Sequence, residues 1–396
     1  MIYLDHAATA PPSRAVLEAQ WPYLTQVFAN PSSAHGPGQA ARAGLDAALA
    51  EIAGVLGCRP GEVVLTSGGT EADDLALLGV AAAAPRGRHV VTTAVEHPAV
   101  LETARALGSG ALGAPFRVDE VGVDGDGVVD LAALAAVLTP ATTICSVMLA
   151  NNEVGAVQPV REVADLCRAV GVPLHVDAVQ APGQLPVRLD DLGADLLSVS
   201  AHKLGGPRGA GVLAVRGAVP LAPMVHGGGQ QRGRRSGTVD VAAAVGTATA
   251  LRLAEEGRAD GATRLAALRD RLVTGVLEAV PGAVLTGPAV DARRADGSPA
   301  RLPGHASFVF PGLGGEAVLL ELEERGVVCS SGSACAADTD DASHVLLAMG
   351  LGEDAARTAV RLTLGPSTTP EEVEDVVRLL PEAVAAAGGA ALLAHA

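Results

Sequence analysis

Short apolar runs alternate with longer amphipathic segments through the first two thirds of this chain, and this alternation limits the folds it can adopt. Six runs are predicted as buried strands: residues 62–67, 89–95, 143–150, 172–179, 195–202 and 211–216. Residues 71–84 and 160–171 have the composition of helices. Strands that alternate with helices predict an α/β fold with a mostly parallel, doubly wound sheet. Ligands of such sheets bind beyond the carboxyl ends of the strands.

The charge balance and the cysteine content exclude several classes of protein. The net charge is −16, with 44 acidic and 28 basic residues, so we expect no direct contact with nucleic acid. Five irregularly spaced cysteines favour free thiols in a reducing compartment. Residues 1–12 lack the pattern of a signal peptide, and residues 383–396 are too short to span a membrane. We therefore expect a soluble, cytoplasmic protein.

The pattern changes near residue 253, which predicts a second domain. Residues 252–280 are predicted as one or two long charged helices, and residues 307–310 and 361–364 as strands. A Pro/Gly-rich loop occupies residues 285–304. We predict a large domain over residues 16–253. Residues 1–15 and 254–396 would form a smaller α+β domain.

The first predicted strand runs into a glycine-rich turn. Gly69 and Thr70 open the helix that follows, and a helix N-terminus with a nearby hydroxyl can bind an anion such as phosphate. The alternative is an ordinary helix cap with an acidic first turn.

Polar groups also end three other strands. Asp177 sits within an apolar run, where an unpaired carboxylate costs several kcal/mol, so it needs a cationic partner or backbone donors. His97, before Pro98, is either a packing residue or a ring presented to a ligand. Asn152 follows the third strand, where amides form a turn or orient a substrate carboxylate.

Lys203 ends the fifth strand and precedes two glycines. A lysine on a turn is usually solvated, but a lysine at the edge of a sheet can also do covalent chemistry. The ordered set of strand ends provides an anion site, a planar ring, amides, a buried carboxylate and an amine. Pyridoxal 5′-phosphate needs such a set.

Two residues of the second part of the chain are also candidates. Cys335 lies in a Ser/Gly-rich and acidic stretch, which favours an exposed nucleophile, whereas Cys329 ends an apolar run and is expected in the core. Arg361 lies inside a strand pattern, and a buried arginine usually pairs with a carboxylate, here expected to be a substrate's.

Ten motifs over nearly the whole chain resemble those of cysteine desulfurases, which are fold type I pyridoxal-phosphate enzymes of the class V aminotransferase group. They are YLDHAATAPP, NPSSAHGPG, TSGGTEADDLAL, EHPAVLET, NNEVGAVQPV, HVDAVQAPG, SAHKLGGPRGAG, GGGQQRGRRSGT, SSGSAC and VRLTLG. The resemblance implies a large domain with a seven-stranded type of sheet and a small domain with a catalytic cysteine loop at about 328–343. It also implies a homodimer.

The resemblance assigns roles to individual residues. Lys203 would bind the aldehyde of pyridoxal phosphate, Asp177 would pair with its ring nitrogen, and His97 would stack on the ring and, with Lys203, transfer protons. The remaining implied cofactor contacts are Gly69, Thr70, Asn152, Gln180, Ser200, His202 and, from the neighbouring subunit, Thr238. Asn152 and Arg361 would hold the substrate carboxylate.

The implied reaction converts L-cysteine to L-alanine and leaves a persulfide on Cys335. The SSGSAC motif, with the long stretch to His344, favours sulfur delivery to a partner protein, either an iron–sulfur scaffold or a tRNA-thiolation protein. No metal is expected in catalysis, although Cys335 could ligate an iron–sulfur cluster during transfer. Gln231 and Pro366 depart from the family pattern, at positions where Glu and Arg are common.

Three other functions stay open at this point. A selenocysteine lyase or cysteine sulfinate desulfinase shares the scaffold but does not need the loop cysteine. A non-catalytic scaffold would not need Lys203, Asp177 and Cys335 together. A thiol redox protein is disfavoured, because Cys329 and Cys335 do not form a Cys-x-x-Cys motif.

Overall fold

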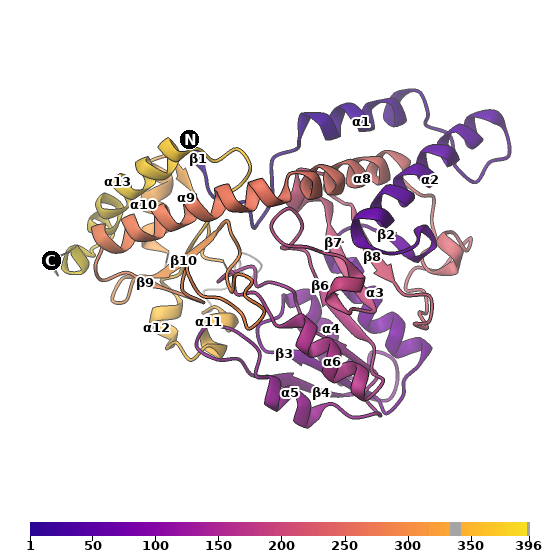
Figure 1. Ribbon diagram of the computed structural model, residues 1–396, viewed down its shortest axis with the longest axis horizontal. Coiled ribbons are helices and arrows are strands. Elements are labelled where there is room, and N and C mark those ends of the chain that lie inside the picture. Colours follow the sequence, from indigo (N-terminus) through magenta and orange to yellow (C-terminus); the bar gives the residue numbers. More distant parts are fainter. Residues whose placement is uncertain (315, 333–341, 394–396) are drawn as a thin grey trace.

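The computed structural model describes residues 1–314, 316–332 and 342–393, with the side chain at position 391 excepted (Figure 1). The strands of the large sheet are β2 (Val63–Thr66), β3 (His89–Thr93), β4 (Arg117–Val121), β5 (Ile144–Ser146), β6 (Leu174–Asp177), β7 (Leu196–Ser200) and β8 (Gly211–Val215). The helices around it are α1 (Arg14–Thr25), α2 (Gly36–Leu56), α3 (Gly69–Ala83), α4 (Pro98–Gly108), α5 (Leu131–Val137), α6 (Val160–Ala169), α7 (Leu189–Leu192) and α8 (Val241–Glu256).

The predicted α/β fold is confirmed. The seven strands lie in the order β2-β8-β7-β6-β5-β3-β4, and β8 is the strand that runs antiparallel to its neighbours. Sequence analysis missed β4, because its residues RVDEV are charged and mostly accessible and form no apolar run. The carboxyl ends of β3, β5, β6 and β7 lie at one edge of the sheet, which is where the predicted site residues follow.

Helices cover both faces of the sheet with separate apolar clusters. One cluster joins α3 and α4 to side chains such as Val90, Ile144 and Leu213. The other joins α2, α6 and α8 to side chains such as Val91 and Val176. Because neighbouring residues of a strand point to opposite faces, Asp177 and His175 lie on the face covered by α3.

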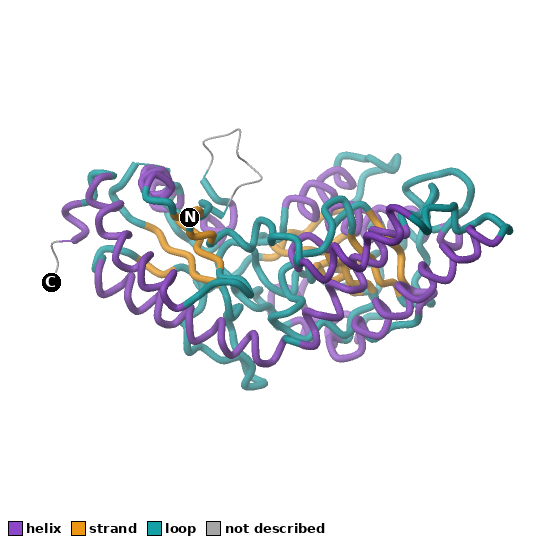
Figure 2. The backbone as a smooth tube through the Cα atoms, turned by 90° about the horizontal axis from the view of Figure 1, so that it is seen from above, coloured by secondary structure: helices purple, strands orange, loops and turns teal. Residues whose placement is uncertain are grey.

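A second, smaller group of strands lies apart from the large sheet (Figure 2). It has its own core. Its strands are β1 (Ile2–Tyr3), β9 (Val284–Leu285), β10 (His305–Val309), β11 (Val327–Val328) and β12 (Val360–Thr363). The helices that pack in this core are α9 (Arg258–Ala279), α10 (Ala317–Glu324) and α13 (Pro370–Ala386). Two short helices, α11 (His344–Ala348) and α12 (Glu353–Ala356), pack in another apolar cluster that includes Val95 and Val154. The order β12-β10-β9 is antiparallel, and β1 pairs with β11, so the N-terminus belongs to this core.

Two long helices connect the two groups of strands. α8 and α9 are separated only by Gly257, and they run past both sheets (Figure 1). The predicted domain limits stay a prediction. The limit between residues 15 and 16 falls inside α1, and the limit between residues 253 and 254 falls inside α8. In the described part of the chain no helix is long and apolar enough to cross a bilayer.

Glu96 ties the end of β3 to the end of β5. Its Oε1 accepts hydrogen bonds from the Thr93 hydroxyl (2.6 Å) and from the Met148 amide (3.0 Å). The side chain is fully buried, and this burial raises the pKa of Glu96 to about 8. Glu96 is therefore mostly protonated at neutral pH.

This burial predicts a pH-dependent stability. The folded pKa of Glu96 lies above its unfolded value, so the stability it contributes is complete at low pH and is lost as pH rises through the folded pKa. Glu96→Gln should remove this loss, worth roughly 1.4 kcal/mol per pKa unit. Urea unfolding of the cofactor-free protein at about pH 5 and about pH 8.5 measures it. Parallel pH profiles for the two proteins would contradict this account.

Gln231 forms hydrogen bonds with the backbone of β2, the outermost strand on one side of the large sheet. The amide of Leu65, in edge strand β2, donates to Gln231 Oε1 (2.7 Å), and Gln231 Nε2 donates to the Leu65 carbonyl (2.9 Å). Gln231 has a φ of 50°, which is strained for a residue other than glycine. This departure from the family pattern therefore has a structural use, since a glutamate could accept from Leu65 but could not donate.

We expect Gln231→Glu to lower the free energy of unfolding by about 1–3 kcal/mol at neutral pH, because the Leu65 carbonyl loses its donor. Gln230→Glu is the matched control. Gln230 accepts from the Gly237 amide through Oε1, a contact that glutamate preserves. Denaturant unfolding measures both variants, and equal stabilities for them would refute this role of Gln231.

Candidate active site

Lys203 lies in a short 3-10 turn (Ala201–Leu204) that directly follows β7. Its Nζ donates hydrogen bonds to the carbonyls of Ala7 and, at 2.8 Å, Ala8. Gly205 follows with a φ of 69°, and a Cβ there would stand 2.9 Å from the Pro11 carbonyl. The glycine after the lysine thus lets the N-terminal segment cross the site.

Lys203 is the electrostatic centre of the candidate site. Burial and, next, the Lys203 charge lower the pKa of His97 to about 4, and the same two causes lower that of His202 to about 4. Burial raises the pKa of Asp177 to about 6, and Lys203 opposes this rise. Lys203 and His97 both make further interactions within the described part of the chain. The structure therefore groups His97, Asp177 and His202 around Lys203.

Asp177 ends β6 as a buried carboxylate. Its Oδ1 accepts a hydrogen bond from the Val179 amide at 2.9 Å. A backbone donor, which was one of the two predicted kinds of partner, is therefore present for one of the two carboxylate oxygens. The same sheet face carries His175 and Ser198, and their side chains lie 2.9 Å apart. The carboxyl of Asp73, from α3, is fully buried beside them, and this burial raises its pKa well above its usual value. A cationic ring placed against Asp177 would offset the cost of this burial.

The glycine turn before α3 has the form of an anion cradle. α3 begins at Gly69, where a Cβ would stand 2.8 Å from the Val179 side chain and 3.5 Å from the Ser200 Cβ. The hydroxyl oxygen of Ser200 is buried without a hydrogen-bond partner among the described residues. Thr70 is exposed as the second residue of α3. An unsatisfied hydroxyl beside a helix N-terminus fits a bound phosphate.

Two predicted ligands of the cofactor contact the N-terminal segment. His202 Nδ1 lies 3.1 Å from the Thr9 hydroxyl, and Gln180 Nε2 donates to the Ala7 carbonyl at 3.0 Å. Ala7 therefore accepts from both Gln180 and Lys203.

His97 caps the helix that follows it. Its Nδ1 accepts from the Ala99 amide at 3.1 Å, which places the proton of the neutral ring on Nε2. His97 can therefore have both predicted roles, because the same hydrogen bond that caps the helix also orients the half-buried ring next to Lys203.

The two asparagines after β5 have different environments. Asn151 is fully buried; its side-chain oxygen accepts from the amides of Glu153 (2.8 Å) and Val154 (2.9 Å). Asn152 is half-buried, and its carbonyl accepts from Arg361 Nη1 at 2.9 Å.

Arg361 is buried and pairs with a carboxylate of its own chain. Its Nη2 donates to Asp5 at 2.7 Å, whereas Nε has no partner among the described residues. Sequence analysis missed Asp5, because it stands next to His6 in a short polar turn with no apolar pattern. The unpartnered Nε is a donor that could serve a substrate carboxylate.

Thr238 is a predicted site residue that is not brought to Lys203 in this chain. Thr238 lies in a separate hollow of about 330 Å³ whose described lining, Tyr23, Phe28 and Asp240 included, contains none of the other predicted site residues. Cys335 lies outside the described residues. Cys329 packs partly buried against the small core, and burial raises its thiol pKa to about 12, so it is a poor nucleophile at neutral pH.

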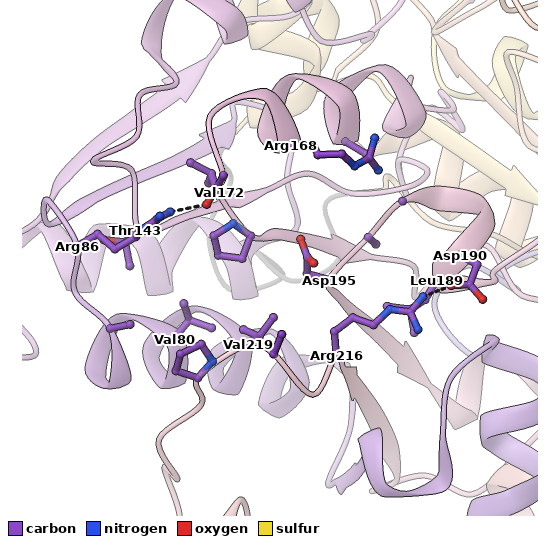
Figure 3. A pocket seen from close by; sticks show the side chains of 18 residues that line it. Val80, Arg86, Thr143, Arg168, Val172, Leu189, Asp190, Asp195, Arg216 and Val219 are labelled. Carbon is purple, nitrogen blue, oxygen red and sulfur yellow. Dashed lines mark hydrogen bonds and ion pairs between the residues drawn. The ribbon is translucent and has the colours of Figure 1, made fainter.

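Two larger cavities differ in their relation to this site. One of about 600 Å³ is lined by Lys203, Gln180 and, from the small domain, His305 and Pro366. The other, of about 660 Å³, lies at the amino ends of the strands (Figure 3). Arg86, Asp195 and other side chains line it, and none of the predicted site residues does so within the described part of the chain. We therefore place the site at the carboxyl edge.

The residues at this edge fit pyridoxal phosphate. Ser200 and the α3 N-terminus provide unsatisfied groups for a phosphate, Asp177 a buried anion for a ring nitrogen, and Lys203 an amine for an aldehyde.

Comparison with known proteins agrees with this fit. Residues 2–376 match the aminotransferase class-V family. The chain is 44% identical to an IscS-like cysteine desulfurase of Mycobacterium tuberculosis, over 100% of this chain and 99% of that protein. A solved NifS-like protein superposes with a TM-score of 0.88 and 36% identity, over 97% of this chain and 99% of its own. A solved structure of SspA in complex with cysteine has a TM-score of 0.77 and 31% identity, over 93% and 100%. The chain therefore belongs to the class-V aminotransferase family, in the group of the cysteine desulfurases.

Proposed function

We propose that this protein is a pyridoxal-phosphate-dependent cysteine desulfurase whose cofactor is bound at the carboxyl edge of the large sheet. The observation that carries the proposal is the grouping of Lys203, the buried Asp177 carboxylate and the unsatisfied Ser200 hydroxyl at one edge. Lys203 would hold the aldehyde carbon. Gly69, Thr70, Ser200 and His202 would hold the phosphate, with Gln180 and Asn152 as further contacts.

When bound, the cofactor supplies an electron sink for the charge left by the α-proton of the substrate. The anionic Asp177 would keep the ring nitrogen protonated. His97 is neutral at pH 7 and would place its ring face against the cofactor. Lys203 is favoured over His97 as the base, because the Ala99 amide occupies the Nδ1 lone pair of His97.

Arg361 and Asn152 would bind the substrate carboxylate. The unpartnered Nε of Arg361 supports this role, since a buried guanidinium donor needs an acceptor. L-Cysteine is the substrate we propose, and the relative solved with cysteine supports the choice.

Cys335 would accept the sulfur. Its thiolate attacks the sulfur of L-cysteine, an S–S bond forms, and the carbon–sulfur bond breaks. The carbon that loses sulfur takes up a proton, so that L-cysteine and a thiol give L-alanine and a persulfide. The persulfide sulfur would pass to an acceptor protein, an iron–sulfur scaffold or a tRNA-thiolation protein, with transient cluster ligation by Cys335 as a further proposal.

We also propose that the active unit is a cytoplasmic homodimer. Helix α1 and the turn after it expose apolar side chains: Leu17 (53% exposed), Trp21 (63%), Leu24 (61%) and Phe28 (78%). An exposed apolar patch of this kind is typical of an interface. Phe28 lines the same hollow as Thr238, so a partner that covers the patch would bring Thr238 to the interface.

The test of the activity compares wild type, Cys335→Ala and Lys203→Ala with L-cysteine. Wild type should release L-alanine and carry a protein persulfide. Cys335→Ala should lose both, by about 100-fold or more in alanine, and Lys203→Ala should also lose the visible absorption of the bound cofactor. Equal alanine from wild type and Cys335→Ala would assign a lyase that ignores the loop cysteine. A colourless wild type would favour the non-catalytic scaffold.

The test of the dimer is Trp21→Glu, which places a charge in the apolar patch. Light scattering should detect a monomer, and cofactor affinity should fall about tenfold or more if Thr238 contributes across the interface. Leu320→Glu is the control, because Leu320 is similarly exposed (61%) on α10, away from this patch. A dimer that survives Trp21→Glu with unchanged cofactor affinity would contradict the proposed interface.

A further inference from the structure

Three successive carbonyls of the turn after β5 are each held by a side chain from the C-terminal part of the chain. Arg361 Nη1 donates to the Asn152 carbonyl at 2.9 Å. His305 Nε2 lies 3.1 Å from the Glu153 carbonyl, and Arg301 Nη1 donates to the Val154 carbonyl at 2.9 Å. We name Arg301, His305 and Arg361 the carbonyl clamp.

The clamp acts on one side of the turn, and the large sheet holds the other side. The Asn151 side-chain oxygen accepts hydrogen bonds from the amides of Glu153 and Val154. The carbonyls of the same two residues are held by the clamp, so both backbone groups of each residue are fixed. The Leu302 amide also donates to the Gly155 carbonyl at 2.8 Å. The turn is thus held by Asn151 on one side and by the clamp and Leu302 on the other.

His305 packs tightly against the turn. Burial lowers its pKa well below the usual value, so the ring is neutral, and the contact with a carbonyl requires the proton on Nε2. Gly155 has a φ of 75°, and a Cβ there would stand 2.8 Å from the His305 Cβ and 2.9 Å from its ring. A side chain at position 155 would therefore push the ring away from the turn.

Three hydrogen bonds fix the orientation of the Arg361 guanidinium. Nη1 is used by the carbonyls of Asn152 and, at 3.3 Å, Gly332, and Nη2 is used by Asp5. Nε is the donor without a partner among the described residues. If the turn shifts, Asn152 and the Nε edge of Arg361 move relative to each other.

We propose that His305 and Arg301 are positioning residues for recognition of the substrate carboxylate. They hold the turn that carries Asn152 in register with the Nε edge of Arg361, and so set the selectivity for amines that bear an α-carboxylate. This inference rests on the proposed function, because it deepens the assignment of the same substrate site.

The test compares equilibrium binding of L-alanine and ethylamine, which differ only by the carboxylate, through the change in cofactor absorption. Wild type should bind L-alanine more tightly. His305→Phe keeps the ring but removes the donor to Glu153, so the ratio of the two Kd values should fall about tenfold. Gly155→Ala should reduce the ratio in the same direction, and it keeps the test available if His305→Phe does not fold.

His89→Phe is the matched control. His89 is also a buried strand histidine, and its ring contacts the side chains of Thr142 and Asp119. It differs in position, because it starts β3 and so lies at the amino ends of the strands, away from the candidate site. This variant should leave the Kd ratio unchanged. In an Asn152→Ala background, His305→Phe should reduce the ratio little further, since residues that act through one another are not additive.

Two results would overturn the inference: a His305→Phe ratio equal to that of wild type, or an equal loss of affinity for both amines, which is the mark of a merely structural role. A wild type that does not discriminate between the amines would also overturn it. Conversion of L-cysteine to L-alanine by wild type tests the proposed function separately. An inactive wild type that still selects L-alanine would refute the function and leave the clamp standing.

Discussion

The burial of the Asp177 carboxylate is the constraint on which the rest of the site depends. An uncompensated carboxylate in such a place costs several kcal/mol, and one backbone amide offsets only part of this. The neighbouring Asp73 and Glu96 are also buried, and burial raises the pKa of each carboxyl. A cationic ring bound against Asp177 would offset part of the cost of burying acidic groups at this place.

The N-terminal segment links that site to Arg361, the proposed partner of the substrate carboxylate. Asp5 pairs with Arg361, the carbonyls of Ala7 and Ala8 accept from Lys203, and Ala7 also accepts from Gln180. The segment starts in the small core through β1 and crosses to the large sheet. The carbonyl clamp makes a second link between the C-terminal part of the chain and the turn after β5, on the Asn152 side. In the proposed site, substrate recognition would therefore depend on how these two parts of the chain are held together.

Local patterns in the sequence predicted the large sheet because each buried strand carries its own apolar run. β4 was missed because its sequence is charged, and β1 because two residues form no pattern. Lys203, Asp177 and His97 were found because each is a polar group at the end of an apolar run. Asp5, His305 and Arg301 were not found, since their importance lies in contacts across more than 145 residues of chain that no local pattern encodes.

The most direct test of the central claim is to locate the cofactor covalently. Purified protein is loaded with pyridoxal phosphate, the bound cofactor is fixed by reduction with borohydride, and the modified peptide is identified by mass spectrometry. The account predicts that the cofactor mass is found on Lys203, and that Asp177→Ala greatly lowers the modified fraction. Lys203 is the single lysine of the sequence. Modification at the amino group of Met1 in its place, or none under conditions that label a known pyridoxal-phosphate enzyme, would contradict it.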